Sequence, residues 1–173
     1  MKYILETARL RLREFTLDDG EFIVDLMNSP GWLKFIGDRN VRTTGQAQKY
    51  LENGPIKAYQ ENGFGLSMVE RKDDDVPVGM CGILQRPTLD TPDIGFAFLP
   101  AFNGKGYALE IASAVMTYAQ SNLGLSRIAA ITLRENDRSI RLLEKLGMTY
   151  RSKFSFPGSE EELLLYGNFE EAV

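Results

Sequence analysis

The apolar residues of the chain repeat with two different periods, which predict its strands and helices. Alternation at period two and short apolar runs predict strands, because successive side chains of a strand point to opposite faces. Spacings of three and four residues predict helices. The expected strands are residues 9–13, 64–71, 76–84, 93–99, 127–133, 149–156 and 161–169. The expected helices are residues 18–28, 44–61, 107–122 and 136–146, with Gly54 and Pro55 breaking the second one midway.

The length of the chain predicts one domain spanning residues 1–173. A chain of this size with 43% apolar residues can bury one sizeable core. Charges appear too early in the N-terminal segment for a signal peptide, and no apolar run reaches about 18 residues. We therefore expect a cytoplasmic protein that does not bind membranes.

The composition excludes several kinds of chemistry. A net charge of −4 argues against nucleic acid as a partner and suits a cationic amine substrate. The chain has no histidine, so it lacks both the usual metal ligand and the commonest general base, and we expect no metal site. Its one cysteine, Cys81, lies in an apolar run and is expected to be a buried strand thiol without a role.

A glycine-rich loop connects a predicted strand to the strongest predicted helix, in the segment DIGFAFLPAFNGKGYALE. The free N–H groups of a helix N-terminus attract anions, and glycine lets an anion approach the backbone closely. The loop therefore suits a diphosphate, although a tight turn without a ligand would have the same pattern. It does not match a nucleotide P-loop, since Lys105 precedes glycine, nor a dinucleotide fingerprint, since Leu109 replaces the third glycine.

Two other segments each allow a structural and a functional interpretation. Asn136 lies between a predicted strand and a predicted helix, where it can be an N-cap or bind a ligand through its amide. Trp32 and Phe35 lie in the glycine-rich and charged segment GWLKFIGDRN. They can line a substrate site, or they can cover the edge of the core, because aromatic side chains favour burial anywhere.

Three segments together resemble the GNAT family of N-acetyltransferases. TARLRLREFTLDD is similar to the first strand of the branch that acetylates the N-terminal amines of ribosomal proteins. IGFAFLP with NGKGYALE resembles the central strand and pyrophosphate loop of the family, and ENDRSIRLLEKLGM resembles its last coenzyme-contacting strand and helix. The three segments occur in the expected order along the whole chain.

The resemblance implies an α/β fold with a mixed, mostly antiparallel seven-stranded sheet that is splayed at its centre and flanked by about four helices. It implies acetyl-CoA as cosubstrate, with the pantetheine arm beside one strand and the pyrophosphate on the loop amides. The residues expected to bind it are Phe98, Leu99, Asn103, Gly104, Lys105, Gly106, Tyr107, Ala108, Asn136 and Ser139. Two features depart from the family pattern: no Gln or Arg precedes Gly104 at positions 101–103, and Leu143 occupies a position where many members have a catalytic tyrosine.

The implied reaction is direct attack of a neutral amine on the thioester, without a covalent enzyme intermediate. A backbone N–H near Phe98 or Leu99 would stabilise the oxyanion. Without histidine the general base must be a carboxylate, for which Asp93 is the first candidate, although it can equally be a solvated residue at a strand end. Ser139 is the candidate acid by resemblance, and water can also protonate the thiolate.

The expected acceptor is the α-amine of a protein N-terminus. A small amine such as a polyamine or aminoglycoside is the main alternative, and a non-catalytic acyl-CoA sensor of the same fold is a third, motivated by Leu143. The sequence leaves open whether the protein is a monomer or a homodimer.

Overall fold

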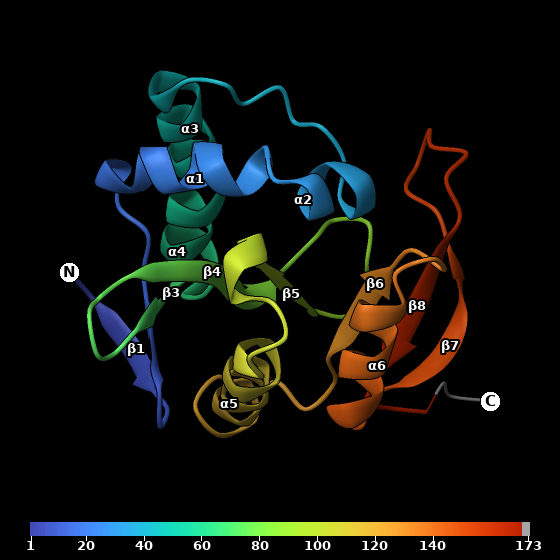
Figure 1. The fold of residues 1–173 in the computed structure, drawn as a ribbon. Coiled ribbons are helices and arrows are strands. Elements are labelled where there is room, and N and C mark those ends of the chain that lie inside the picture. Colours follow the sequence, from blue (N-terminus) through green and yellow to red (C-terminus); the bar gives the residue numbers. More distant parts are fainter. Residues whose placement is uncertain (171–173) are drawn as a thin grey trace.

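The computed structural model describes residues 1–170, which form a continuous eight-stranded sheet with helices on both faces (Figure 1). The strands are β1 (Tyr3–Glu6), β2 (Leu10–Arg13), β3 (Leu66–Arg71), β4 (Pro77–Leu84), β5 (Asp93–Phe98), β6 (Ala129–Thr132), β7 (Thr149–Phe154) and β8 (Leu163–Gly167). The α-helices are α1 (Gly20–Met27), α2 (Pro30–Phe35), α3 (Thr44–Leu51), α4 (Lys57–Asn62), α5 (Tyr107–Ser121) and α6 (Asp137–Lys145). Shorter helical segments are η1 (Leu17–Asp19), η2 (Glu52–Ile56) and η3 (Pro100–Phe102).

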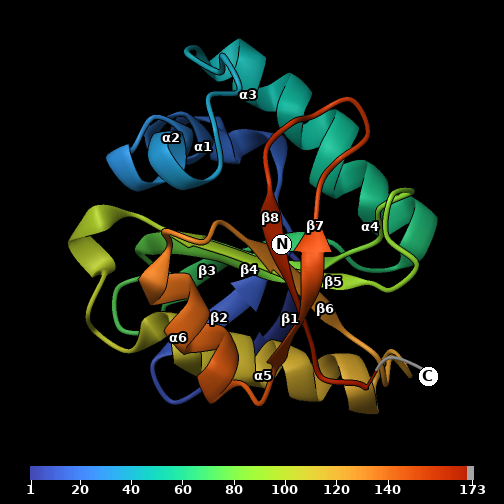
Figure 2. The same ribbon diagram turned by 90° about the vertical axis from the view of Figure 1, so that its right-hand side faces the viewer.

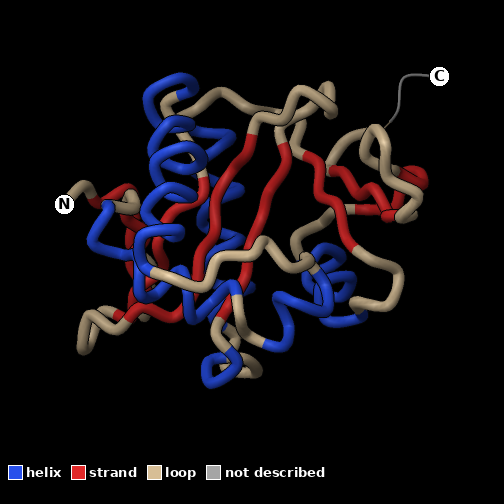
Figure 3. Tube along the Cα trace, turned by 90° about the horizontal axis from the view of Figure 1, so that it is seen from above, coloured by secondary structure: helices blue, strands red, loops and turns tan. Residues whose placement is uncertain are grey.

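The sheet has the strand order β1-β2-β3-β4-β5-β6-β8-β7, and only β5 and β6 are parallel neighbours. Strands β1 to β5 form the left part of the molecule in Figure 1, and β6, β8 and β7 form the right part. Helices α1 to α4 cover one face, whereas α5 and α6 cover the other (Figure 2). Seen from above, the strands cross the middle of the molecule (Figure 3). The expected mixed, mostly antiparallel fold is confirmed.

The expected count of seven strands is wrong, because the N-terminal segment forms a hairpin of two strands. The Thr7 N–H donates to the Leu10 carbonyl at 2.9 Å, and the Leu10 N–H donates to the Thr7 hydroxyl at 3.1 Å. These two bonds close a tight turn between β1 and β2. The preceding segment, residues 3–6, lacks clear alternation, so the pattern of the sequence indicated only β2.

The helices also differ from the expected four. Pro30 does not simply end α1 but starts the short helix α2, since the first position of a helix needs no N–H. Gly54 and Pro55 do not break the second helix. The chain forms the π-helical turn η2 between α3 and α4, and this wider turn carries Pro55 without ending the helical path.

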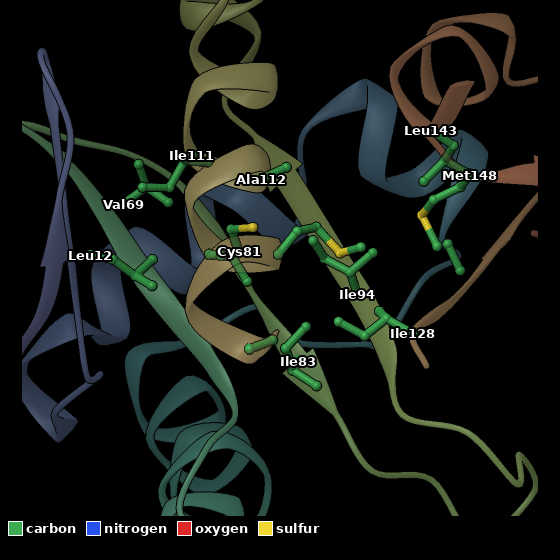
Figure 4. Close-up of a cluster of buried hydrophobic side chains, with 14 of the residues drawn as sticks. Leu12, Val69, Cys81, Ile83, Ile94, Ile111, Ala112, Ile128, Leu143 and Met148 are labelled. Carbon is green, nitrogen blue, oxygen red and sulfur yellow. The ribbon is translucent and has the colours of Figure 1, made fainter. Parts of the chain in front are cut away.

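Each face of the sheet has its own cluster of buried apolar side chains. The first cluster packs against α5 and includes Cys81, Ile111 and Leu143 (Figure 4). The second packs against α1, α2 and α3 and includes Trp32 and Met68. Burial of apolar surface on both faces of one sheet is the main force that holds the strands in place.

The single cysteine is a packing residue, as the sequence predicted. Cys81 in β4 is completely buried, and burial raises the pKa of its thiol to about 12. A thiol with so high a pKa stays protonated and is a poor nucleophile. No helix within residues 1–170 has the length and the apolar content needed to cross a bilayer.

Candidate active site

The sheet opens between β5 and β6. These strands are paired only at Asp93 and Ala129, where the Ala129 N–H donates to the Pro92 carbonyl at 2.8 Å. On its other side, β5 pairs with β4 along its whole length, from Asp93 to Phe98. Beyond Asp93, the edge of β5 that faces β6 therefore has no neighbouring strand within residues 1–170.

The open edge of β5 presents alternate peptide groups. The Leu99 N–H donates to the Val78 carbonyl at 3.0 Å, so the backbone N–H of residue 99 points toward β4. Since the peptide groups of an antiparallel ladder alternate in direction, the backbone N–H and C=O groups of Phe96 and Phe98 point toward the open side. Of the two residues expected to pair with an extended ligand, only Phe98 has its N–H available.

A glycine-rich loop follows β5 and leads into α5. Gly104 and Gly106 have φ angles of 75° and 78°, which lie in the left-handed region that glycine adopts most readily. Gly106 is the N-cap of α5 and provides no side-chain cap. The Asn103 N–H is engaged by the Pro100 carbonyl at 3.2 Å.

The amides of residues 104–108 have no hydrogen-bond partner in the described part of the chain. These groups lie at the positive end of the dipole of the 15-residue helix α5. The Lys105 side chain is exposed beside them. The loop therefore has the free amides and the dipole that a diphosphate site needs, and its role as that site stays a prediction.

Asn136 is the N-cap of α6, so its structural interpretation applies. Its Oδ1 accepts a hydrogen bond from the Ser139 N–H at 3.2 Å. Within residues 1–170, the Asn136 Nδ2 group and the Ser139 hydroxyl have no hydrogen-bond partner. Both side chains are half-buried, so these polar groups remain available to a ligand as well.

Asp93 lies at the point where β5 and β6 separate. It is only 1% exposed, so the alternative that it is a solvated residue at a strand end is wrong. The Arg86 Nε donates to both carboxylate oxygens, at 3.0 and 3.2 Å. Burial raises the pKa of Asp93, and the charge and hydrogen bond of Arg86 oppose this shift.

Arg86 and Tyr50 are polar residues of this region that the sequence pattern did not reveal. The Arg86 guanidinium lies 5.6 Å from the centre of the Phe156 ring, in the segment between β7 and β8. Burial raises the pKa of the Tyr50 phenol, and the nearby charges of Arg39 and Arg86 oppose the shift. The charge of Arg86 is itself compensated by its ion pair with Asp93.

Trp32 and Phe35 lie on α2 with different surroundings. Trp32 is 5% exposed within the second cluster, and its indole N–H donates to the Gly37 carbonyl at 3.0 Å. Phe35 is half-buried, and the Lys34 ammonium lies 5.0 Å from its ring centre. The core-edge interpretation fits Trp32, and Phe35 is the better placed of the two to contact a ligand.

Leu143 is 1% exposed in the first cluster, where Figure 4 shows it next to Met148. The side chain fills the core between α6 and the sheet. Leu143, at the position where the resemblance implies a tyrosine in many members, is a packing residue in this chain.

The family model described as "Acetyltransferase (GNAT) domain" matches residues 9–149, which are most of the chain. A similar relative is the uncharacterized N-acetyltransferase YoaA of Bacillus subtilis (strain 168), which is 32% identical over 147 residues, covering 83% of this chain and 81% of YoaA. The chain belongs to the GNAT family of N-acetyltransferases. This confirms the family and the acetyltransferase class that the sequence predicted.

Solved GNAT structures have the same fold. The acetyltransferase from Agrobacterium tumefaciens str. C58 superposes with a TM-score of 0.81 at 22% identity, over 98% of this chain and 95% of that one. RimL, a ribosomal L7/L12 alpha-N-protein acetyltransferase in complex with coenzyme A, gives a TM-score of 0.75 at 16% identity over 99% and 100% of the two chains.

A spermidine N-acetyltransferase chimera from Vibrio cholerae and hSSAT has the same fold as well, with a TM-score of 0.74 at 18% identity over 92% and 95% of the two chains. The GNAT fold therefore occurs in enzymes that modify protein N-termini and in enzymes that modify polyamines. Members of the family use acetyl-CoA as the acetyl donor.

Proposed function

We propose that the protein transfers the acetyl group of acetyl-CoA to the α-amine of a protein N-terminus. The observation that supports this acceptor is the absence of histidine, which leaves the chain without the commonest general base. An α-amine that is already partly neutral at pH 7 needs less help from a base than a fully charged alkyl amine of a polyamine does. An N-terminal peptide has one amine and a series of carbonyl groups, which can accept hydrogen bonds from arginine.

The open edge of β5 and the glycine-rich loop would together hold acetyl-CoA. Phe98 would bond the extended pantetheine arm through its carbonyl group, as an additional strand would, which leaves its N–H for the oxyanion. The free amides of residues 104–108 would bind the pyrophosphate. The Asn136 Nδ2 group would donate to a carbonyl of the pantetheine near its acetyl end.

The chemistry requires a base, an oxyanion donor and an acid. The amine nitrogen attacks the thioester carbon, its proton passes to Asp93 along a chain of water molecules, because about 16 Å of β5 separates Asp93 from Phe98, and the carbon–sulfur bond breaks. The Phe98 N–H stabilises the oxyanion. The Ser139 hydroxyl, or water, gives a proton to the thiolate.

An α-amine suits a chain without histidine. Its pKa is about 7.8, so roughly a tenth or more is already neutral at pH 7, whereas a lysine amine near 10.4 is almost entirely charged. Burial raises the pKa of Asp93, which makes its carboxylate a stronger base. The Arg86 ion pair keeps that carboxylate ionised and oriented before the amine arrives.

Asp93→Asn tests the assignment of the base. Removing a general base lowers rates by about 10²- to 10⁴-fold, so we expect kcat to fall by at least about 100-fold while acetyl-CoA binding measured by calorimetry is unchanged. Asp90→Asn is the matched control, because Asp90 is an exposed carboxylate in the loop that precedes β5. Equal rates for the two variants would exclude Asp93 as the base.

The acceptor itself is tested by release of CoA thiol with a panel of N-terminal peptides, polyamines and aminoglycosides. We expect turnover with the peptides, and weaker acetyl-CoA binding in Asn136→Ala. Turnover with small amines alone would favour the alternative acceptor. Tight acetyl-CoA binding without turnover on any amine would favour an acyl-CoA sensor, and no acetyl-CoA binding at all would contradict the assigned coenzyme site.

A further inference from the structure

The glycine-rich loop proposed to bind the diphosphate has few side-chain contacts of its own that would fix its conformation. Gly104 and Gly106 have no side chains to pack, and glycine has more backbone conformations to lose than any other residue. A loop that must become ordered when it binds a ligand loses affinity, whereas a loop that is already in the bound shape does not. Residues outside the loop must therefore fix it.

Arg9, in the turn between β1 and β2, makes three contacts with this loop and with the start of α5. Its Nη1 donates to the Lys105 carbonyl at 2.9 Å, and its Nε donates to the Glu110 carboxylate at 2.7 Å. Its guanidinium lies 4.6 Å from the centre of the Tyr107 ring. The planar guanidinium can make these contacts at the same time because its donors point in fixed, different directions.

The turn between β1 and β2 is itself attached to α5. The Glu110 Oε1 accepts from the Arg9 backbone N–H at 2.9 Å and from the Thr7 hydroxyl at 2.7 Å. Glu110 therefore holds the backbone of the residue whose side chain holds the loop. This arrangement joins chain segments about 100 residues apart in the sequence.

The bond from Arg9 to the Lys105 carbonyl also sets the direction of the next amide. A trans peptide unit is planar, and its C=O and N–H point in opposite directions. With the Lys105 carbonyl bound to Arg9, the Gly106 N–H points away from the turn between β1 and β2. That N–H is one of the free amides assigned to the pyrophosphate.

Arg9 also neutralises a charge that would oppose an anion. Glu110 lies in the first turn of α5, where its carboxylate would repel a bound diphosphate. Burial raises the pKa of Glu110, but the hydrogen bonds from Thr7 and Arg9 and the charge of Arg9 outweigh burial, so the pKa is lowered. The carboxylate stays ionised, and Arg9 compensates its charge.

We infer that Arg9 is a positioning residue for the diphosphate of acetyl-CoA: through the Lys105 carbonyl and Glu110 it fixes the glycine-rich loop with its amides directed at the ligand. This inference rests on the coenzyme site proposed above. Arg9 lies outside the loop, in the turn between β1 and β2. It is therefore distinct from the Gln or Arg that usually begins the loop in this family and that is absent here.

The test compares two acetyl donors, acetyl-CoA and S-acetylpantetheine, which lacks the diphosphate. In Arg9→Ala we expect the KM for acetyl-CoA to rise about tenfold, the effect of losing one good charged hydrogen bond, with kcat nearly unchanged. The kcat/KM with S-acetylpantetheine should stay within about twofold of the unmodified protein, because that donor has no diphosphate to bind.

Lys72→Ala is the matched control. The Lys72 ammonium bonds the Thr7 carbonyl at 3.1 Å and Glu6 at 3.3 Å, so it holds the same turn without contacting the loop. We expect it to leave both donors unaffected within about twofold. Arg9→Lys covers the case in which the alanine variant does not fold, because lysine keeps the charge but lacks the planar fork, and it should also raise the KM for acetyl-CoA alone.

The outcomes separate the two proposals. Equal losses with both donors would mean that Arg9 only stabilises the fold, and an unchanged KM for acetyl-CoA would overturn the inference directly. In either case the coenzyme site would stand, provided that the unmodified protein uses acetyl-CoA. If the unmodified protein neither binds nor uses acetyl-CoA, the coenzyme site itself is wrong.

Discussion

Glu110 illustrates how single polar contacts at the start of α5 affect stability. The pKa of its carboxyl lies below the ordinary value of 4.5, so its ionised form is bound more strongly in the folded protein than in the unfolded chain. The resulting stabilisation is fully present above pH 4.5 and is lost as the pH falls through the lower pKa of the folded state.

Glu110→Gln should therefore lower the free energy of unfolding by about 1 kcal/mol at pH 7, a modest value because solvent screens this partly exposed pair. The difference between the variant and the unmodified protein should shrink below pH 4.5. Urea unfolding at pH 7 and at about pH 3 measures it. A difference that is the same at both pH values would contradict an ionised Glu110 bound to Arg9.

At the scale of residues, the sequence predicted which residue types could bind a ligand better than it predicted their burial and their contacts. The glycines of the loop and the position of Asn136 were recognisable, because helix starts have characteristic residue types. The partner of Asp93 was not, because Arg86 lies in a loop without periodicity and the ion pair depends on how that loop folds over β5. The burial of Trp32 depends likewise on α2, which begins at a proline that usually signals an end.

At the scale of elements, the glycine-rich loop gives a direct prediction for Gly104→Ala. A Cβ at Gly104 would meet nothing within 4 Å, so its effect comes only from the positive φ, which costs an alanine about 1 kcal/mol. We expect the loop to shift and the KM for acetyl-CoA to rise several-fold, measured by steady-state kinetics.

The control for this substitution is Gly45→Ala in α3. A Cβ there also meets nothing within 4 Å, and the position has no positive φ, so alanine should leave the kinetics unchanged and stabilise the helix by up to about 1 kcal/mol. If Gly104→Ala had the same kinetics as Gly45→Ala, the shape of the loop would not matter for acetyl-CoA.

Strongly periodic elements were predicted within a few residues, and weakly patterned ones were not. The helix α5 repeats apolar residues at helical spacing over four turns, so its bounds agree closely with the expected residues 107–122. β1 has only four residues and an irregular pattern. The π-helical turn η2 could not be predicted, because it depends on the packing of α3 and α4 across Pro55 rather than on a local signal.

At the scale of the whole molecule, the two apolar clusters lie on opposite faces of one sheet and share its strands. Met68 and Val69 are neighbours in β3, yet they belong to different clusters. Loss of either cluster would expose the other, so the chain should unfold as one cooperative unit, in line with the single domain expected from its length.

The single tryptophan makes cooperative unfolding testable. Trp32 lies in the second cluster, so its fluorescence reports on that face of the sheet, whereas far-UV circular dichroism reports on the whole molecule. We expect the two urea transitions to coincide. Two separate midpoints would show that the faces unfold independently and would contradict a single domain.

The proposed function depends on one feature of the whole molecule, the fork where the sheet opens between β5 and β6 beyond Asp93. Its place could be expected only from the resemblance to the GNAT family, because nothing in the local pattern of β5 shows that its outer edge lacks a neighbouring strand. Once the fork is present, it brings the glycine-rich loop, Asn136 and Asp93 around one opening from segments far apart in the chain.

The central claim is tested most directly by locating the acetyl group on a peptide with a free α-amine and one internal lysine, after incubation with the protein and acetyl-CoA. Fragmentation by mass spectrometry distinguishes the two amines. The proposed function predicts acetylation of the α-amine alone, and no product from the same peptide with a blocked N-terminus. Acetylation of the lysine, or no acetylation of the peptide beside rapid acetylation of spermidine, would contradict it.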